Sequence, residues 1–308
     1  MNNYTYQNPK AYCAKNKPVF SQPFLLMLAA ALAWTSLLEA ETHPPAQTVI
    51  MQEIREHDRA YYAEHTEVHS YTNESGQTMQ YRLFMPRNYD PAKKYPLLLS
   101  LHGAGERGDD NLAQLCFWVA GWMDEAVQME HPCILLMPQC PAGQQWVDTP
   151  WDRGSYSFSK IPISRSLKLA KEIFDEVVQK KSVDRSRIYV MGASMGGYGT
   201  WNFVMRYPEL VAAAVPMCGA GDPVMAGTIK NIPIWAFHGD ADPVVPPCGS
   251  QEMIDAIQRA GGTSVRLTMY QGVKHDCYLK ALKEQKLVDW IFKQQKTDIK
   301  PDASGGKL

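Results

Sequence analysis

The chain has 308 residues, of which 45% are hydrophobic and 20% are charged, and its formal net charge is −1. The length is enough for one large domain with a well-buried core, or for two small domains, and the composition is ordinary for a soluble globular protein. A net charge near zero gives no support for nucleic acid or an anionic membrane surface as a partner.

Residues 1–40 differ from the rest of the chain. Three lysines precede an apolar run over residues 23–34, and small residues recur as far as Ala40. This order is typical of a secretory signal peptide that is cleaved after Ala40, so the mature protein is expected to be secreted or periplasmic, with no stable membrane partner. The alternative is an uncleaved membrane anchor, because the uncharged run over 18–38 is about long enough to cross a bilayer.

The segment that follows this leader, residues 41–65, is polar and is expected to lie on the surface, with a short helix near 52–63. Residues 67–71 and 79–85 then alternate apolar and polar side chains on either side of Asn73-Glu74-Ser75-Gly76. This alternation around a turn sequence predicts an antiparallel β-hairpin.

Beyond the hairpin, stretches with strand and helix character alternate. Predicted strands cover 95–101, 133–137, 187–193, 211–217, 233–237 and 264–270, and predicted helices cover 112–127, 164–181, 195–207, 250–260 and 278–294. Such alternation is typical of an α/β fold, in which a mostly parallel central sheet has right-handed crossovers and helices on both faces. We expect one domain over residues 66–295, followed by a flexible tail over 296–308.

The sequence Gly192-Ala193-Ser194-Met195-Gly196 joins a predicted strand to the helix that follows it. This Gly-x-Ser-x-Gly pattern is typical of a nucleophile elbow, a tight turn that needs glycines and leaves the serine hydroxyl above the edge of the sheet. We interpret Ser194 as a nucleophile, which makes an acyl-transfer hydrolase the leading hypothesis. The alternative is a glycine-rich loop in which the serine has no chemical role.

A serine nucleophile needs a base within hydrogen-bond distance, and in an open α/β sheet the working groups lie in loops at the carboxyl ends of strands. Of the eight histidines, only His102, His238 and His275 directly follow a predicted strand. His102 and His238 each precede a glycine and are expected to shape their loops rather than to act as the base. His275 lies in a glycine-containing loop before the last helix, so we predict that it is the base; the alternative is a histidine that only begins the helix.

The acidic partner is expected in the loop after the strand over 233–237. Asp242 precedes Pro243, which restrains it to an extended conformation and fixes the direction of its carboxylate. Asp240 lies next to a glycine and is the alternative candidate, although such a residue often bonds only its own turn. With Asp242, the order of the three residues along the chain is Ser…Asp…His, the order of one known hydrolase fold.

The motifs also point to a family. Over residues 66–295 the chain resembles the α/β-hydrolase superfamily, and the segments similar to those of secreted esterases are 101–108, 137–141, 192–197 and 238–246. Relatives of these esterases include feruloyl esterases and polyhydroxybutyrate depolymerases, and some are classed as predicted prolyl-oligopeptidase-like peptidases. The resemblance implies that Ser194, Asp242 and His275 form a catalytic triad. It also implies that the N–H groups of Ala104 and Met195 form the oxyanion hole.

The expected site is open, because residues 218–232 are too few to form a helical lid between two predicted strands. The irregular segment over 139–161 contains Trp146, Trp151 and Tyr156. We predict that these three side chains rim a groove that binds substrate, because aromatic faces stack on flat apolar surfaces. The alternative is that the rings only pack the loop.

Seven cysteines are too few for a scaffold that depends on disulfides, and Cys13 lies in the predicted leader. Cys248 and Cys277 each lie just past one of the two loops that must meet at the site. They are therefore the predicted disulfide pair.

The favoured function is a serine carboxylesterase that acts through an acyl-enzyme on aryl or carbohydrate-linked esters, either small molecules or polymer-linked. This chemistry needs no organic cofactor, and the histidines and cysteines lack the short spacings of a metal site. The alternatives are a serine peptidase that acts on small peptides and a non-catalytic binding module of the same fold. The sequence gives no indication of a particular oligomeric state.

Overall fold

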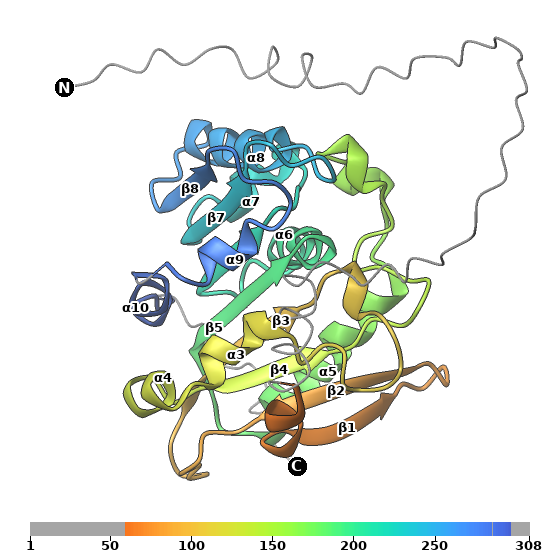
Figure 1. The fold of residues 1–308 in the computed structure, drawn as a ribbon, viewed down its shortest axis with the longest axis vertical. Helices are drawn as coiled ribbons and strands as arrows, with labels where there is room; N and C mark the ends of the chain where they lie inside the picture. Colours follow the sequence, from red (N-terminus) through yellow and green to blue (C-terminus); the bar gives the residue numbers. More distant parts are fainter. Residues whose placement is uncertain (1–58, 285, 297–308) are drawn as a thin grey trace, which may run out of the picture.

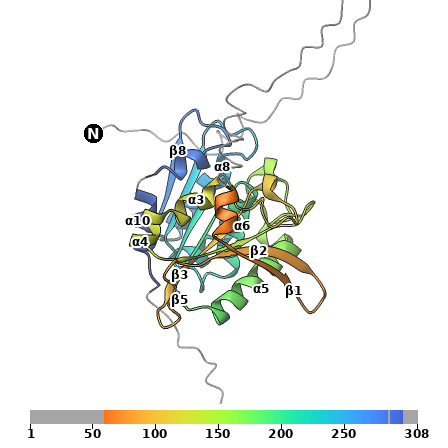
Figure 2. The same ribbon diagram turned by 60° about the horizontal axis from the view of Figure 1, so that its bottom comes forward.

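The computed structural model describes residues 59–284 and 286–296, which form an α/β structure built on one eight-stranded sheet (Figure 1). The strands are β1 (Glu67–Thr72), β2 (Thr78–Phe84), β3 (Tyr95–Leu101), β4 (Ile134–Pro138), β5 (Val183–Ala193), β6 (Ala213–Met217), β7 (Ile234–Gly239) and β8 (Val265–Tyr270). Their order in the sheet is β1-β2-β4-β3-β5-β6-β7-β8, so β1 and β8 form its two edges (Figure 2).

The sheet is parallel except at one end. β2 is antiparallel to both of its neighbours, β1 and β4, and the other neighbouring strands are parallel. The predicted hairpin and the predicted mostly parallel sheet are confirmed.

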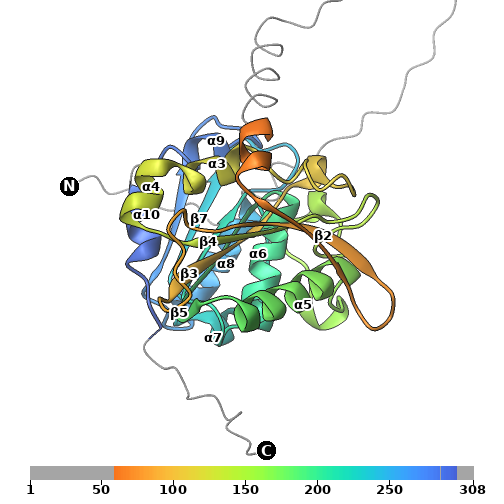
Figure 3. The same ribbon diagram turned by 90° about the horizontal axis from the view of Figure 1, so that it is seen from below.

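Helices cover both faces of the sheet (Figure 3). Those on one face are α5 (Arg165–Lys180), α6 (Met195–Arg206), α7 (Ala226–Ile229) and α8 (Cys248–Arg259). Those on the other face are α3 (Phe117–Met123), α4 (Glu125–Glu130), α9 (Tyr278–Ala281) and α10 (Lys286–Phe292). Residues 59–64 are also helical and are the described part of the helix predicted near 52–63.

Each face of the sheet buries its own hydrophobic cluster. In β3, Leu97, Leu99 and Leu101 belong to the cluster under α5 and α6, whereas Leu98 belongs to the cluster on the opposite face. Successive side chains of a strand point to opposite faces, so a strand buried on both sides is continuously apolar. That is why the run over 95–101 could be recognised as a central strand.

Two predicted helices are each divided in two. The prediction of one helix over 112–127 is wrong, because the chain becomes extended at Asp124 (φ −55°, ψ 138°) between α3 and α4. The Asp124 carboxylate accepts a hydrogen bond from the Ala126 N–H at 2.9 Å and so caps α4. The helix predicted over 278–294 is likewise two helices, α9 and α10.

Some predictions concern residues outside the described part of the chain. The leader over 1–40, most of the segment over 41–65 and nearly all of the tail over 296–308 lie there, so leader cleavage and the flexible tail stay predictions. Within the described residues, no helix combines the length and the apolar character needed to cross a membrane.

Candidate active site

Ser194 stands between β5 and α6 in a backbone conformation that few side chains adopt. Its φ is 57° and its ψ is −119°, a strained combination for a residue other than glycine. The turn is tight, because a Cβ atom added at Gly192 or Gly196 would collide with the carbonyl oxygen of Leu101. Both positions therefore require glycine, and the turn has the strand–serine–helix geometry of a nucleophile elbow.

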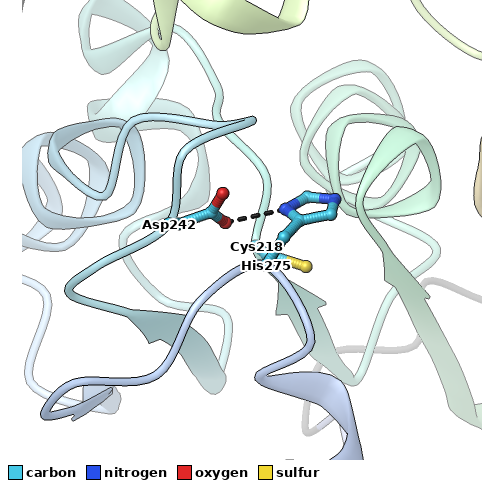
Figure 4. Close-up of side chains that lie close together, drawn as sticks. All are labelled: Cys218, Asp242 and His275. Atoms are coloured by element: carbon cyan, nitrogen blue, oxygen red, sulfur yellow. Dashed lines mark hydrogen bonds and ion pairs between the residues drawn. The ribbon is translucent and has the colours of Figure 1, made fainter. Parts of the chain in front are cut away.

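The side chains of Ser194, His275 and Asp242 form a hydrogen-bonded chain. His275 Nε2 lies 2.7 Å from Ser194 Oγ. On the other side of the ring, His275 Nδ1 lies 2.7 Å from Asp242 Oδ2, as Figure 4 shows. The three residues follow β5, β7 and β8, whose carboxyl ends lie at the same end of the sheet. The His275 side chain is 22% exposed and that of Asp242 is fully buried. The imidazole can therefore meet a substrate, whereas the carboxylate can only orient the imidazole.

The Asp242 carboxylate is held in its ionised form. Burial alone would raise its pKa, but hydrogen bonds from His238, His275 and the Val245 N–H lower the pKa of Asp242 well below its usual range. Asp240, the alternative acid, instead accepts a hydrogen bond from the Gly272 N–H at 2.6 Å. The structure thus brings Asp242 to the serine and histidine, and Asp240 to a turn.

The two other strand-end histidines are buried. His102 Nδ1 donates to the Gly103 carbonyl oxygen at 2.7 Å, and its Nε2 accepts from the Cys140 N–H at 2.8 Å. Burial lowers the pKa of His102 to about 4, so this ring is neutral and shapes its loop, as expected. His238 bonds its own loop too, but its Nε2 also lies 3.2 Å from Asp242 Oδ2. Sequence reasoning missed this contact, although the two residues are only four positions apart.

The residues predicted to supply the oxyanion hole begin two helical turns beside the elbow. Met195 is the first residue of α6, so its N–H has no partner within the helix. Ala104 is the first residue of the 3-10 helix η1 (Ala104–Glu106). Leu101, at the end of β3, pairs with Gly192 of β5, so the two turns leave neighbouring strands at the same level. Amides so placed can donate hydrogen bonds to a negatively charged oxygen next to Ser194.

The structure corrects the prediction that three aromatic side chains rim a groove. Trp146 is fully buried, and its indole N–H donates to the His102 carbonyl oxygen at 2.9 Å. Tyr156 is 9% exposed, and its hydroxyl accepts from Asn202 Nδ2 at 2.6 Å. Both rings are part of the core between the loop and α6, because each satisfies its polar atom inside the protein. For them, the alternative of packing the loop is the correct one.

Trp151 differs from the other two rings. It is only partly buried, in the 3-10 helix η2 (Trp151–Arg153), and the Arg107 guanidinium lies 5.9 Å from its ring centroid. Its carbonyl oxygen accepts from the Tyr198 hydroxyl at 3.0 Å, which ties it to the helix that follows Ser194. Among the described residues its indole nitrogen is buried and has no hydrogen-bond partner, so only the exposed part of the ring can meet a substrate. Trp151 therefore remains a candidate for contact with substrate.

Cys218 lies next to the hydrogen-bonded chain (Figure 4). Its sulfur, a carboxylate oxygen of Asp242 and a ring nitrogen of His275 all lie within 4.8 Å of one another, and each is of a type that can bind a metal. Burial raises the pKa of the Cys218 thiol well above its usual value. Because metals bind the thiolate, and because the carboxylate and imidazole already bond each other, this set is better suited to proton transfer than to metal binding.

The predicted Cys248–Cys277 disulfide is wrong, because Cys277 is a free thiol. It is fully buried, and its sulfur points to the Phe237 carbonyl oxygen at 3.9 Å. The two loops do meet, as the pairing assumed, but through Asp242 and His275.

No lid domain separates β6 from β7, as predicted. The connection holds only the 3-10 helix η4 (Pro223–Met225) and the one-turn helix α7. Access to Ser194 does not depend on movement of a domain inserted there.

The chain is similar to known esterases in both sequence and structure. Residues 72–266 match the protein family described as "Putative esterase". The chain belongs to this esterase family. A solved structure described as a thermostable esterase is 35% identical, with a TM-score of 0.70, and the match covers 76% of this chain and 64% of that one. The fold is that of the α/β-hydrolases.

Two curated relatives of this esterase are much longer than it is. The bifunctional acetylxylan esterase/xylanase XynS20E of Neocallimastix patriciarum is 25% identical over 179 residues, which are 58% of this chain and 23% of the relative. Poly(3-hydroxyalkanoate) depolymerase C of Paucimonas lemoignei is 27% identical over 132 residues, which are 40% of this chain and 28% of the relative. The chain thus spans about a quarter of the length of these relatives.

Proposed function

We propose that this chain is a serine carboxylesterase in which Ser194, His275 and Asp242 form the catalytic triad. The observation that carries the proposal is the hydrogen-bonded chain of these side chains at a strained elbow, in a member of an esterase family. The ionised Asp242 holds the Nδ1 proton of His275, so the free Nε2 faces the serine hydroxyl.

The reaction follows from this geometry. His275 Nε2 takes the proton of Ser194 as its Oγ bonds the ester carbonyl carbon, and the N–H groups of Ala104 and Met195 stabilise the negative oxygen that forms. The C–O bond to the alcohol breaks when His275 returns the proton to the leaving oxygen. A water molecule then repeats the sequence on the acyl-enzyme, releases the acid and restores the serine.

For the substrate we propose aryl or carbohydrate-linked esters, including esters carried on polymers. Two relatives are described as an acetylxylan esterase and a poly(3-hydroxyalkanoate) depolymerase, which supports a polymer-linked ester. The partly buried Trp151, close to the helix that carries the serine, offers an aromatic face for stacking. No domain inserted between β6 and β7 stands in the way of a bulky alcohol.

We also propose that the protein is exported and that residues 1–40 are removed. The basic start, apolar centre and small residues before Ala40 support this. Mass spectrometry of the protein recovered from the periplasm or medium should find a chain that begins near Glu41, and recovery of the full-length chain from the cytosol would contradict export.

The decisive experiment for the activity uses a fluorophosphonate probe and a substrate panel. Wild type should be labelled at Ser194 and should hydrolyse aryl acetates, acetylated sugars and feruloyl esters better than aminoacyl anilides. Ser194→Ala should lose both properties, whereas Ser182→Ala, which removes a hydroxyl bonded to the Pro91 carbonyl oxygen, should keep them. Preference for the anilides would indicate a peptidase, and no labelling at any position would indicate a binding module.

A further inference from the structure

Two imidazoles contact one oxygen atom of Asp242. His275 Nδ1 lies 2.7 Å from Oδ2, and His238 Nε2 lies 3.2 Å from the same oxygen. The other oxygen, Oδ1, accepts hydrogen bonds from the N–H groups of Val244 at 2.8 Å and Val245 at 3.0 Å. The carboxylate therefore has four donors, and two histidines share the charge on Oδ2.

His238 acts on the site only through Asp242. It lies in β7, its side chain is completely buried, and it makes no contact with the hydroxyl of Ser194 among its hydrogen bonds in the described residues. A substrate cannot reach it. Any influence on catalysis must pass through the shared carboxylate oxygen.

The neighbours of His238 Nε2 fix a hydrogen on that nitrogen. Besides Asp242 Oδ2, Nε2 faces the Val245 carbonyl oxygen at 3.1 Å. A carbonyl oxygen and an ionised carboxylate can only accept hydrogen bonds. Nε2 must therefore be protonated to make either contact.

The other ring nitrogen is linked to a serine on α8. Ser250 Oγ lies 2.8 Å from His238 Nδ1 and 3.0 Å from the Gly219 carbonyl oxygen. A hydroxyl has one hydrogen to donate. If the ring is neutral, the hydroxyl must donate either to Nδ1 or to Gly219, and one contact is lost. If the ring is an imidazolium, Nδ1 donates to Ser250, Ser250 donates to Gly219, and every contact is made.

We propose that His238 is a positioning residue whose protonated ring, held by Ser250, lowers the proton affinity of the Asp242–His275 pair. A positively charged group that donates to Oδ2 offsets part of the negative charge of the carboxylate. Less of that charge is then available to stabilise the His275 imidazolium. His275 consequently becomes a competent base at a lower pH than it would beside Asp242 alone. This inference rests on the esterase mechanism proposed above.

The other titratable groups near the carboxylate do not produce the same effect. Cys218 and Tyr198 both interact with it, but burial raises the pKa of each well above its usual value, so both are neutral over the working range. Lys274 and Asp276 flank His275 along the chain and are solvent-exposed. They carry opposite charges and are screened by water and salt.

The test is the pH dependence of kcat/KM in His238→Gln and His238→Met. Glutamine can still donate to Asp242 but cannot carry a charge, and methionine can do neither. The acid limb of this profile is the part in which kcat/KM rises with pH. We expect it to move to higher pH by about one unit in His238→Met and by less in His238→Gln. If both variants fold and keep the wild-type limb, the proposal is overturned and His238 only fills space.

His102→Gln is the matched control. His102 is also a fully buried histidine at a strand end, but its partners are the Gly103 carbonyl oxygen and the Cys140 N–H. Its replacement should lower the rate, because it shapes the loop that carries Ala104, and should leave the position of the acid limb unchanged. A shift as large as that of His238→Met would show that any damage to the site moves the limb, which would also overturn the proposal.

A second measurement covers variants that do not fold. Nitrogen NMR of the histidine rings in the intact wild-type enzyme should show both nitrogens of His238 protonated at neutral pH, and an unprotonated Nδ1 would overturn the proposal. Ser250→Ala removes the acceptor for Nδ1 and should move the acid limb upwards by a smaller amount. Failure of the esterase mechanism itself would look different, because wild type would then be inactive or Ser194→Ala would remain active.

Discussion

Two regions of the molecule contain side chains of types that often serve in active sites. The first region comprises the loops after β5, β7 and β8, and the second is the loop over 139–161. The side chains have different roles in the two regions. In the first region, Ser194, Asp242 and His275 bond to one another at the end of the sheet. In the second, Trp146 and Tyr156 bond to atoms of the protein interior. A residue type that is common in active sites therefore does not mark a site by itself, because its hydrogen-bond partners decide its role, and a long loop can be part of the core.

The largest expected effect tests whether the proposed reaction needs the hydroxyl of Ser194. Ser194→Ala should lower kcat on an aryl acetate by about 10⁴-fold or more, because no other group can form the acyl-enzyme. The melting temperature should change little, since alanine leaves the backbone of the elbow as it is. Retained activity with an unchanged fold would remove the first region from the chemistry.

The role of the second region can be tested by the effect of a substitution there on the stability of the protein. Trp146→Ala should lower the free energy of unfolding by about 3–5 kcal/mol, because it leaves a cavity and removes the indole donor to the His102 carbonyl oxygen. Denaturant unfolding measures this loss, and Trp146→Phe, which keeps most of the volume, should cost less. A loss below about 1 kcal/mol would mean that the ring is not a core side chain.

The pH dependence of stability separates Asp242 from an ordinary surface carboxylate. Its folded-state pKa is lowered, so it contributes stability above its unfolded pKa, and this contribution is lost as the pH falls through the lower folded value. Between about pH 5 and pH 2, the free energy of unfolding of wild type should therefore fall by on the order of 2 kcal/mol more than that of Asp242→Asn. Thermal unfolding across this range measures the difference, and equal slopes would contradict the hydrogen bonding described for the carboxylate.

The smallest expected effect concerns Trp151, which lies in the second region and is bonded through its carbonyl oxygen to the helix after Ser194. Trp151→Ala should lower kcat/KM on aromatic or sugar esters by about 1 kcal/mol relative to a small acetyl ester, because a stacking contact is lost. Equal losses on every ester would mean that Trp151 only holds the loop together.

Predictions from the sequence succeeded where a local rule was sufficient. The strand over 95–101 is apolar because it is buried on both faces, and the elbow glycines stand where a Cβ would collide with Leu101. Pro243 identified Asp242 rather than Asp240 as the carboxylate that is held still, and the structure brings Asp242 to His275. In each case the sequence pattern around the residue was sufficient for the prediction, even where the contact that explains it is remote in the chain.

Predictions failed where the outcome depends on partners far apart in the chain. Trp146 is buried because His102, remote in sequence, offers it a carbonyl oxygen, and Cys277 is turned towards the interior by the packing beneath β7. The break at Asp124 had a local signal, an aspartate that can cap a helix, which the apolar pattern around it concealed. The contact of His238 with Asp242 spans only four positions, but the bond of His238 to Ser250 of α8 is shown only by the assembled structure.

The elbow is built without any contribution from the hydroxyl that it presents. Its backbone is fixed by glycines and by the hydrogen bond from the Ser194 N–H to the Met217 carbonyl oxygen at 3.0 Å. The backbone of the elbow therefore does not depend on the hydroxyl, and a thiol at this position would have its sulfur on the same Cβ, facing the same imidazole. Exchange of serine for cysteine would change the proposed covalent intermediate from an ester into a thioester, with no change to the sheet below the elbow.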